Sequence, residues 1–129
     1  MSQPRLLILS LGGTITMVPG EGRGIAPKLG AADLVAAVPA LAEIAQIEAR
    51  SPLRLPSPSL APADLLAVAR DIEAGFREGF DGAVVIQGTD TIEESAFLLD
   101  LLLTGDRPVV VTGAMRGAGA PGADGPANL

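Results

Sequence analysis

The chain contains no histidine, cysteine, tryptophan or tyrosine in its 129 residues. Without histidine and cysteine it cannot build a Ser-His-Asp or Cys-His catalytic set, an imidazole or thiolate metal site, or a disulfide bond. The polar chemistry that is left belongs to hydroxyls, carboxylates, amides and a few basic side chains. A site in this protein is therefore expected to depend on hydroxyl groups.

Positive charge and long apolar runs are also scarce. Nine Lys and Arg residues stand against fifteen Asp and Glu residues, which gives a net charge of −6, and the basic residues do not cluster. Since the nucleic-acid backbone attracts the opposite sign, we expect no nucleic-acid partner. No run approaches the ~20 apolar residues that span a bilayer, and residues 6–11 are too short for a signal peptide and lack its cleavage pattern. We therefore expect no membrane partner and a cytoplasmic location.

Aliphatic side chains are abundant instead. Hydrophobic residues make up 48% of the chain and aromatic residues only 2%, and the mean hydropathy is +0.42. A domain of this size builds a modest core, so such a composition predicts more apolar surface than the domain covers alone. We expect a homo-oligomer, a dimer or tetramer, or a further domain that covers the excess.

Apolar runs alternate along the chain with segments of helical periodicity. Strands that alternate with helices form parallel sheets with right-handed crossovers. We therefore predict an α/β fold with three layers, in which helices flank a mainly parallel sheet of four short strands. The predicted strands are residues 5–11, 43–50, 82–86 and 108–112, and the predicted helices are residues 32–38, 62–78 and 91–103.

The helix at residues 62–78 has the clearest signals. Pro62 suits a first turn and Gly79 suits the end, and the expected buried face comprises Leu65, Ala69, Ile72 and Phe76. For the helix at residues 91–103 the expected buried face comprises Ile92, Ala96, Leu99 and Leu103. Residues 12–28, 51–62 and 113–125 are expected to be loops, and Pro126 to begin another helix.

The first candidate motif is Gly12-Gly13-Thr14, directly after the first predicted strand. Two glycines let the backbone turn sharply and approach a ligand closely. A threonine hydroxyl there can act as a nucleophile if a base removes its proton. The alternative is a turn in which the threonine bonds its own backbone. The motif has neither the P-loop spacing nor the G-x-G-x-x-G spacing of dinucleotide sites.

The second motif, Gly88-Thr89-Asp90-Thr91, follows the strand at residues 82–86. Thr91 and Glu94 have capping-box spacing, and Asp90 can also cap the helix. Capping needs only one such residue, so Thr89 is free to hold water or act as a nucleophile, and Asp90 to bind an ammonium group. Ligands of parallel sheets bind at the carboxyl ends of the strands. We therefore expect Thr14, Thr89 and Asp90 to lie together in one site at the carboxyl ends of the strands.

The third motif is Ala-Asp-Gly-Pro at residues 123–126, preceded by Gly-Ala-Met-Arg at residues 113–116. Asp124 is expected to be the N-cap of a helix with Pro126 in its first turn. The functional alternative is a loop whose backbone groups at Gly113 and Ala114 line the same predicted site as Thr14 and Thr89.

Together the three motifs resemble one family, the bacterial-type L-asparaginases. Leu-Gly-Gly-Thr-Ile-Thr at residues 11–16 is similar to their Thr-Gly-Gly-Thr-Ile-Ala, and residues 87–96 resemble their His-Gly-Thr-Asp-Thr-Met-Glu-Glu-Thr-Ala. Residues 107–116 and 123–129 match the next segment in order and spacing. The resemblance implies that residues 1–129 are the N-terminal α/β domain of a short or truncated member, without the C-terminal domain.

The resemblance implies an amidohydrolase that converts L-asparagine and water into L-aspartate and ammonia without cofactor or metal. L-Glutamine is a second candidate substrate. Thr14 matches the threonine that attacks the amide carbon and forms the acyl-enzyme, and Thr89 matches a second threonine that works with an acid and a lysine. The substrate-binding positions are Asp90 for the α-ammonium, Ser57 for the α-carboxylate, backbone amides around Gly88, and the backbone of Ala114 for the amide.

The chain departs from the family pattern in four places. Residues 22–25 stand where family members carry a loop tyrosine, Pro58 replaces the polar residue after Ser57, and Gln87 replaces histidine. The catalytic lysine is expected beyond residue 129, since Lys28 has the pattern of a solvated charge. These departures keep two alternatives open: a non-catalytic amino-acid-binding or assembly module, and the glutamine-dependent amidase domain of a tRNA amidotransferase.

Overall fold

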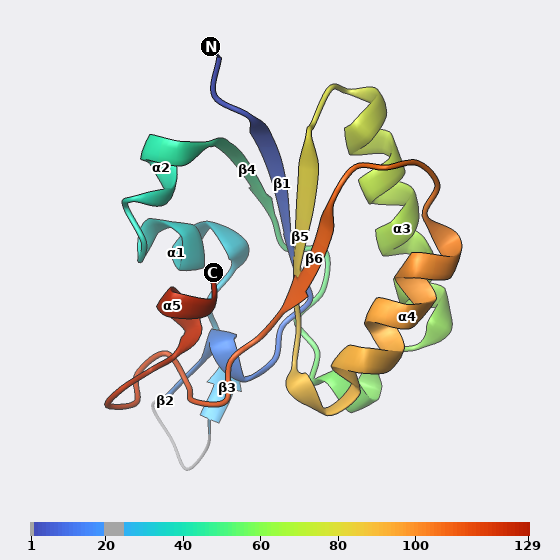
Figure 1. Ribbon diagram of the computed structural model, residues 1–129. Helices are drawn as coiled ribbons and strands as arrows, with labels where there is room; N and C mark the ends of the chain where they lie inside the picture. The colour runs from blue at the N-terminus through green and yellow to red at the C-terminus, as the bar shows by residue number, and fades with distance from the viewer. Residues whose placement is uncertain (1, 20–24) are drawn as a thin grey trace.

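A four-stranded parallel sheet forms the centre of the molecule in the computed structural model, which describes residues 2–19 and 25–129. The strand order is β4-β1-β5-β6, and every neighbouring pair runs parallel (Figure 1). The predicted α/β class and parallel sheet are therefore confirmed. The strands are β1 (Arg5–Ser10), β4 (Gln46–Arg50), β5 (Gly82–Ile86) and β6 (Val109–Thr112).

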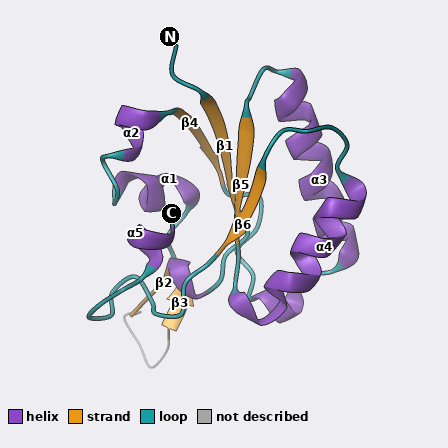
Figure 2. Ribbon diagram, in the orientation of Figure 1, coloured by secondary structure: helices purple, strands orange, loops and turns teal. Residues whose placement is uncertain are grey.

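Helices cover both faces of this sheet, which gives the three predicted layers (Figure 2). The two long helices, α3 (Pro62–Arg77) and α4 (Ile92–Leu102), lie side by side on one face. The opposite face carries three short helices: α1 (Ala31–Ala36), α2 (Leu41–Ile44) and α5 (Gly125–Asn128).

The core is divided by the sheet because successive side chains of a strand point to opposite faces. Leu7 and Leu9 of β1 belong to the cluster under α3, whereas Ile8 belongs to the cluster on the side of α1. All three are at most 2% exposed. A strand buried on both faces needs a continuous apolar run rather than an alternating one, and this run marked β1 in the sequence.

The start, the end and the buried face of helix α3 agree with the prediction for residues 62–78. Pro62 lies in the first turn, the Asp64 carboxylate accepts the Ala61 N–H at 2.8 Å, and Gly79 closes the helix with φ +90°. The expected buried face, namely Leu65, Ala69, Ile72 and Phe76, is at most 9% exposed.

Helix α4 covers the last strand of the sheet, β6, and one side of it faces solvent. Leu99 is buried as expected, but Ile92, Ala96 and Leu103 are only half-buried, and Ser95 is buried in their place. Phe97 and Leu101 are 67% and 65% exposed. The predicted buried face was therefore only partly right, because a helix at the edge of a sheet has less surface to pack against.

Two predicted boundaries were wrong. The strand expected from residue 43 begins at Gln46, because residues 41–44 form α2. The loop expected at residues 12–28 contains an antiparallel pair, β2 (Met17–Pro19) and β3 (Ile25–Pro27). The prediction that residues 22–25 occupy the place of the family tyrosine falls, except for Ile25, outside the described residues.

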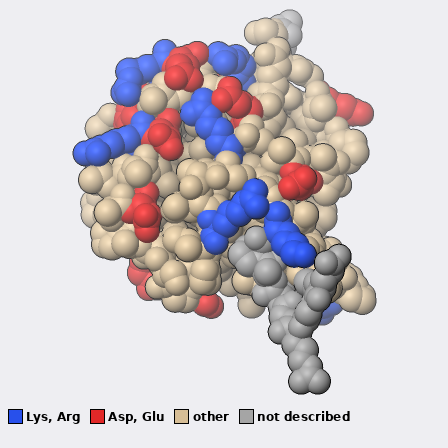
Figure 3. Space-filling view, turned by 180° about the vertical axis from the view of Figure 1, so that it is seen from behind, with Lys and Arg blue, Asp and Glu red and all other residues tan. Residues whose placement is uncertain are grey.

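On the face shown in Figure 3, basic side chains are interspersed with acidic ones rather than gathered in a patch of one sign. Arg50 illustrates this mixing, since its guanidinium lies 2.6 Å from Glu48 and 3.5 Å from Glu78. Within residues 2–19 and 25–129, no helix combines the length and the apolarity that a membrane crossing requires.

Candidate functional site

A small pocket of about 70 Å³ lies at the carboxyl ends of β1 and β5. These strands are adjacent and in register, with Ser10 opposite Ile86, so the loops that follow them leave the sheet side by side. A third segment joins them because the Leu55 N–H donates to the Leu11 carbonyl at 2.9 Å. The pocket is lined by Gly13, Thr14, Met17, Pro56, Ser57, Gly88, Thr89 and Asp90.

Five of the six residues singled out from the sequence thus border one pocket: Thr14, Ser57, Gly88, Thr89 and Asp90. Ala114, for which the resemblance implies a backbone contact, is not among these lining residues, and its side chain is 2% exposed and packs in the cluster with Ile15 and Ile86. The sequence arguments missed Met17, which lies in the short strand β2, and Pro56. A three-residue strand inside a glycine-rich loop has too little alternation to be recognised.

The three loops meet at backbone contact distance. Gly13 has φ +87°, and a Cβ there would lie 2.2 Å from the Gly88 nitrogen. A Cβ at Gly88 would in turn lie 2.8 Å from the Ser57 Oγ. Glycine is therefore required at both positions, for close approach and, at Gly13, also for the positive φ. This contact brings the first and second motifs to the same pocket.

Thr14 begins a 3₁₀ turn, Thr14–Thr16, and its side chain is half-buried at the pocket. The hydroxyl that bonds the backbone of this turn is that of Thr16, which donates to the Gly13 carbonyl at 2.7 Å. The turn-closing alternative considered for Thr14 therefore describes Thr16 instead.

Ser57 is 2% exposed, and its Oγ has no hydrogen-bond partner within the described part of the chain. The residue lies in the 3₁₀ turn Ser57–Ser59. A buried polar group left unpaired costs about 1–3 kcal/mol. Because Ser57 is one of the residues that line the pocket, a bound ligand is the candidate partner for this hydroxyl.

Thr91 does not form the expected capping box, so that prediction was wrong. Its hydroxyl donates to the Ser57 carbonyl at 3.2 Å, and no side chain among the described residues caps α4. The Thr91 hydroxyl thus bonds an acceptor that is distant in the sequence and not the backbone at the start of α4. Thr91 therefore ties the second motif to the Ser57 turn.

Gln87, which comes directly before the second motif, is fully buried. Its Nε2 donates to the Gly88 carbonyl at 3.1 Å, whereas its Oε1 has no partner among the described residues. The glutamine that stands in place of the family histidine thus puts a second unsatisfied polar atom beside Gly88.

Thr89 and Asp90 lie in the 3₁₀ turn Thr89–Thr91 that precedes α4. Asp90 is exposed and is the only titratable side chain among the described residues that line the pocket. The Thr89 hydroxyl donates to the Met115 sulfur at 3.6 Å.

Asp124 is the N-cap of α5, as predicted, but its side chain does not cap the helix. Its two oxygens accept the backbone N–H groups of Met115 and Arg116, each at 2.9 Å. These hydrogen bonds lower the pKa of the Asp124 carboxyl. The carboxylate thus holds the loop that brings Met115 to Thr89.

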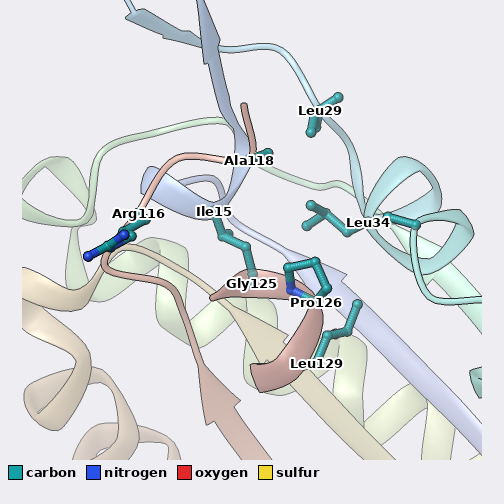
Figure 4. A pocket seen from close by; sticks show the side chains of 9 residues that line it. Ile15, Leu29, Leu34, Arg116, Ala118, Gly125, Pro126 and Leu129 are labelled. Carbon is teal, nitrogen blue, oxygen red and sulfur yellow. The ribbon is translucent and has the colours of Figure 1, made fainter. Parts of the chain in front are cut away.

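A second pocket, of about 80 Å³, lies on the side of the sheet that carries α1 and α5. Figure 4 shows Ile15, Leu34, Pro126 and Leu129 around it, whereas the Arg116 guanidinium points away from these side chains. Its lining offers no convergent polar groups, so the pocket at Thr14 and Thr89 is the better candidate for chemistry. That pocket combines hydroxyls with one carboxylate, which suits a small polar ligand that carries an ammonium group.

Comparisons with known proteins agree over nearly the whole chain. Residues 5–129 match the family model described as "Asparaginase, N-terminal". A probable L-asparaginase of Deinococcus radiodurans is 43% identical over 129 residues, which are 99% of this chain and 38% of that protein. A glutaminase-asparaginase of Pseudomonas fluorescens biotype A is 36% identical and is matched over 96% of this chain and 36% of its own length.

A solved structure, that of a probable cytoplasmic L-asparaginase from Campylobacter jejuni, is similar in fold. The TM-score is 0.89 at 37% identity, and the match covers 98% of this chain and 38% of that chain. The chain therefore spans less than two-fifths of the length of these relatives.

Proposed function

Because the chain belongs to the asparaginase family, whose N-terminal model matches residues 5–129, we propose that the protein is an amidohydrolase that converts L-asparagine and water into L-aspartate and ammonia. The observation that carries this proposal is the convergence of Thr14, Thr89 and Asp90 on one pocket from the ends of neighbouring strands. Residues 1–129 then form the N-terminal α/β domain of the enzyme.

In this proposal Thr14 is the nucleophile. Its Oγ attacks the side-chain amide carbon, the C–N bond breaks, and the amide nitrogen takes up the proton lost by the Thr14 hydroxyl and leaves as ammonia. Water then attacks the acyl-enzyme ester, which releases L-aspartate and restores the hydroxyl. Thr89 is the second hydroxyl at the reacting group and takes part in the proton transfers.

Substrate binding relies on the two ends of the amino acid. The Asp90 carboxylate is the partner of the α-ammonium, and the unpaired, buried Ser57 Oγ is the donor for the α-carboxylate. Backbone groups around Gly88 serve the remaining polar atoms. Burial makes the Ser57 hydroxyl selective, because a ligand without a polar group at that point leaves it unsatisfied.

L-Glutamine is a second candidate substrate. The name of the relative from Pseudomonas fluorescens biotype A includes both activities. The name of the solved relative from Campylobacter jejuni supports a cytoplasmic location, which we propose for this protein as well.

Ammonia release from L-asparagine and L-glutamine tests the proposal. We expect Thr14→Ala to lower kcat roughly 10³-fold or more, as loss of a nucleophile does, and Thr89→Val to lower it strongly. Asp90→Asn should raise KM more than it lowers kcat, because it mainly removes an ammonium partner. Thr104→Ala is the matched control, since Thr104 is exposed and bonds Glu73 outside the pocket.

Two results would overturn the proposal. One is the absence of ammonia release from both amino acids by the wild-type protein. The other is full activity of Thr14→Ala. Calorimetric binding of L-aspartate without any hydrolysis would favour the non-catalytic module instead, and hydrolysis that depends on tRNA would favour the amidotransferase domain.

A further inference from the structure

Met115 is an exposed apolar side chain that makes a specific polar contact. It is 76% exposed, yet its sulfur accepts the hydroxyl hydrogen of Thr89 at 3.6 Å. Packing does not explain such a residue, because most of its surface meets solvent. The polar contact that its side chain makes in the described structure is with a pocket hydroxyl.

The loop that carries Met115 is held from two sides. Asp124 accepts the N–H groups of Met115 and of the next residue, each at 2.9 Å. Asn128, one turn further along α5, donates to the Gly113 carbonyl at 3.0 Å and to the Asp124 carboxylate at 3.3 Å. Together these bonds fix the backbone on both sides of the methionine.

Both branches of the Thr89 side chain are directed toward this segment. Its hydroxyl meets the Met115 sulfur, and its methyl group lies so close to Gly113 that a Cβ there would come within 3.2 Å of it. A threonine χ1 angle determines the directions of both branches at once. The segment therefore selects one rotamer of Thr89.

We propose that Met115 is a positioning residue for Thr89, held in place by the Asp124 and Asn128 clamp. A thioether is a weak acceptor and not a base at neutral pH, so it orients the hydroxyl hydrogen without removing the proton. With the hydrogen directed to sulfur, the oxygen lone pairs are left for the pocket. The effect on turnover rests on the proposed function, whereas the effect on the Thr89 rotamer does not.

The test compares Met115→Leu, which keeps the volume and removes the acceptor, with Met115→Gln, which keeps an acceptor on a side chain of similar length. Phe97→Leu is the control, because Phe97 is also an exposed apolar residue but lies on α4 away from the pocket lining. Methyl labelling of the six threonines reports the χ1 population of Thr89 through its methyl couplings.

We expect Met115→Leu to replace the single Thr89 rotamer by an average. The same variant should lower kcat about five-fold, the factor that corresponds to about 1 kcal/mol, with KM and the melting temperature unchanged. Met115→Gln should restore both readouts. Phe97→Leu should behave like the wild type.

A single Thr89 rotamer in Met115→Leu would overturn the proposal. So would a Met115→Gln variant that is as impaired as Met115→Leu with a lowered melting temperature, since the side chain would then act by packing alone. If no variant and no wild type hydrolyses asparagine or glutamine, the proposed function fails, and the rotamer measurement still decides the role of Met115.

Discussion

At the scale of single residues, the hydroxyl of Ser57 lowers the stability of the fold, and the proposed binding of a ligand explains why it is present. Its hydroxyl is buried without a partner in the described structure and lies against Gly88, whose Cα admits no side chain there. A fold optimised only for stability would place alanine at this position. The presence of serine therefore favours a role in ligand binding.

We expect Ser57→Ala to raise the free energy of unfolding by up to about 1–3 kcal/mol, because it removes an unsatisfied polar group. The same variant should weaken L-aspartate binding roughly five- to ten-fold, since one hydrogen bond to the ligand is lost. Denaturant unfolding and calorimetry measure the two effects. Ser59→Ala, in the same turn but exposed, should change neither, and a destabilised Ser57→Ala would contradict this interpretation.

At the scale of elements, the pocket depends on how closely the loops after β1 and β5 approach each other. A Cβ at Gly13 would lie 2.2 Å from the nitrogen of Gly88, and Gly13 also has φ +87°. Gly105 provides a matched comparison, because it has φ +95° but a Cβ there would meet no atom within 4 Å. The two glycines therefore share a positive φ and differ in steric contact, and Gly13 also has ψ −178°, in a region that is essentially restricted to glycine.

Gly105→Ala should cost about 1 kcal/mol of stability, which is the strain of a left-handed residue with a side chain. Gly13→Ala should cost several-fold more, because the backbone of Gly88 must also move. L-Aspartate binding should survive the first substitution and be lost in the second. Equal losses of stability, measured by urea unfolding, would show that the contact between the two loops contributes nothing.

The hydrogen bonds that Asp124 accepts from the Met115 and Arg116 N–H groups depend on pH. Because the hydrogen bonds from Met115 and Arg116 lower the Asp124 pKa in the folded state, their stabilising effect is fully present above the ordinary aspartate pKa of about 3.9. It is lost as the pH falls through the lower folded-state value.

We therefore expect the amide signals of Met115 and Arg116 to shift together below about pH 4. Amide hydrogen exchange at these two residues should accelerate in the same range. Asp124→Asn should weaken the protection at neutral pH, because one acceptor oxygen becomes a donor group. Asp106→Asn, a change in an exposed turn, serves as control, and unaltered protection in Asp124→Asn would refute the clamp.

The elements that sequence analysis predicted well are those specified by their own residues. Helix α3 carries its start, its buried face and its end within residues 62–79, and β1 and β5 are continuous apolar runs. Asp124 is the N-cap of α5 as predicted, but neither its side chain nor that of Thr91 makes a cap hydrogen bond. Thr91 and Asp124 have the local pattern of helix caps, yet their side chains bond the Ser57 carbonyl and the backbone at residues 115–116.

Such competition from distant partners cannot be deduced from spacing alone. The pocket was accessible to prediction for a different reason: Thr14, Thr89 and Asp90 lie in the loops that follow β1 and β5, and parallel strands end at one edge of the sheet. Ser57 lies seven residues after β4 and was identified only through the family resemblance. The sequence also placed the loop at residues 113–116 near this site, but the contact of the Met115 side chain with Thr89 could not be predicted, because no motif connects the two residues. Only the fold brings the two together.

At the scale of the whole molecule, apolar surface is left uncovered around one edge of the sheet. β6 is the terminal strand, and Val110 within it is 54% exposed. On α4, which packs over β6, Phe97 and Leu101 lie one turn apart and are 67% and 65% exposed. Isolated apolar side chains on a surface are ordinary, whereas a pair on one helix face beside an open sheet edge favours association.

We therefore expect the protein to form a homo-oligomer through this edge, in keeping with its aliphatic composition. The double variant Phe97→Asp/Leu101→Asp should sediment as a smaller species than the wild type, because each buried aromatic or leucine contributes about 1.5–3 kcal/mol to an apolar interface. Ile44→Asp is the matched control, since Ile44 is 62% exposed but lies on α2 across the sheet. A wild-type protein that sediments as a monomer, or an Ile44→Asp variant that dissociates as fully as the double variant, would contradict this assignment of the interface.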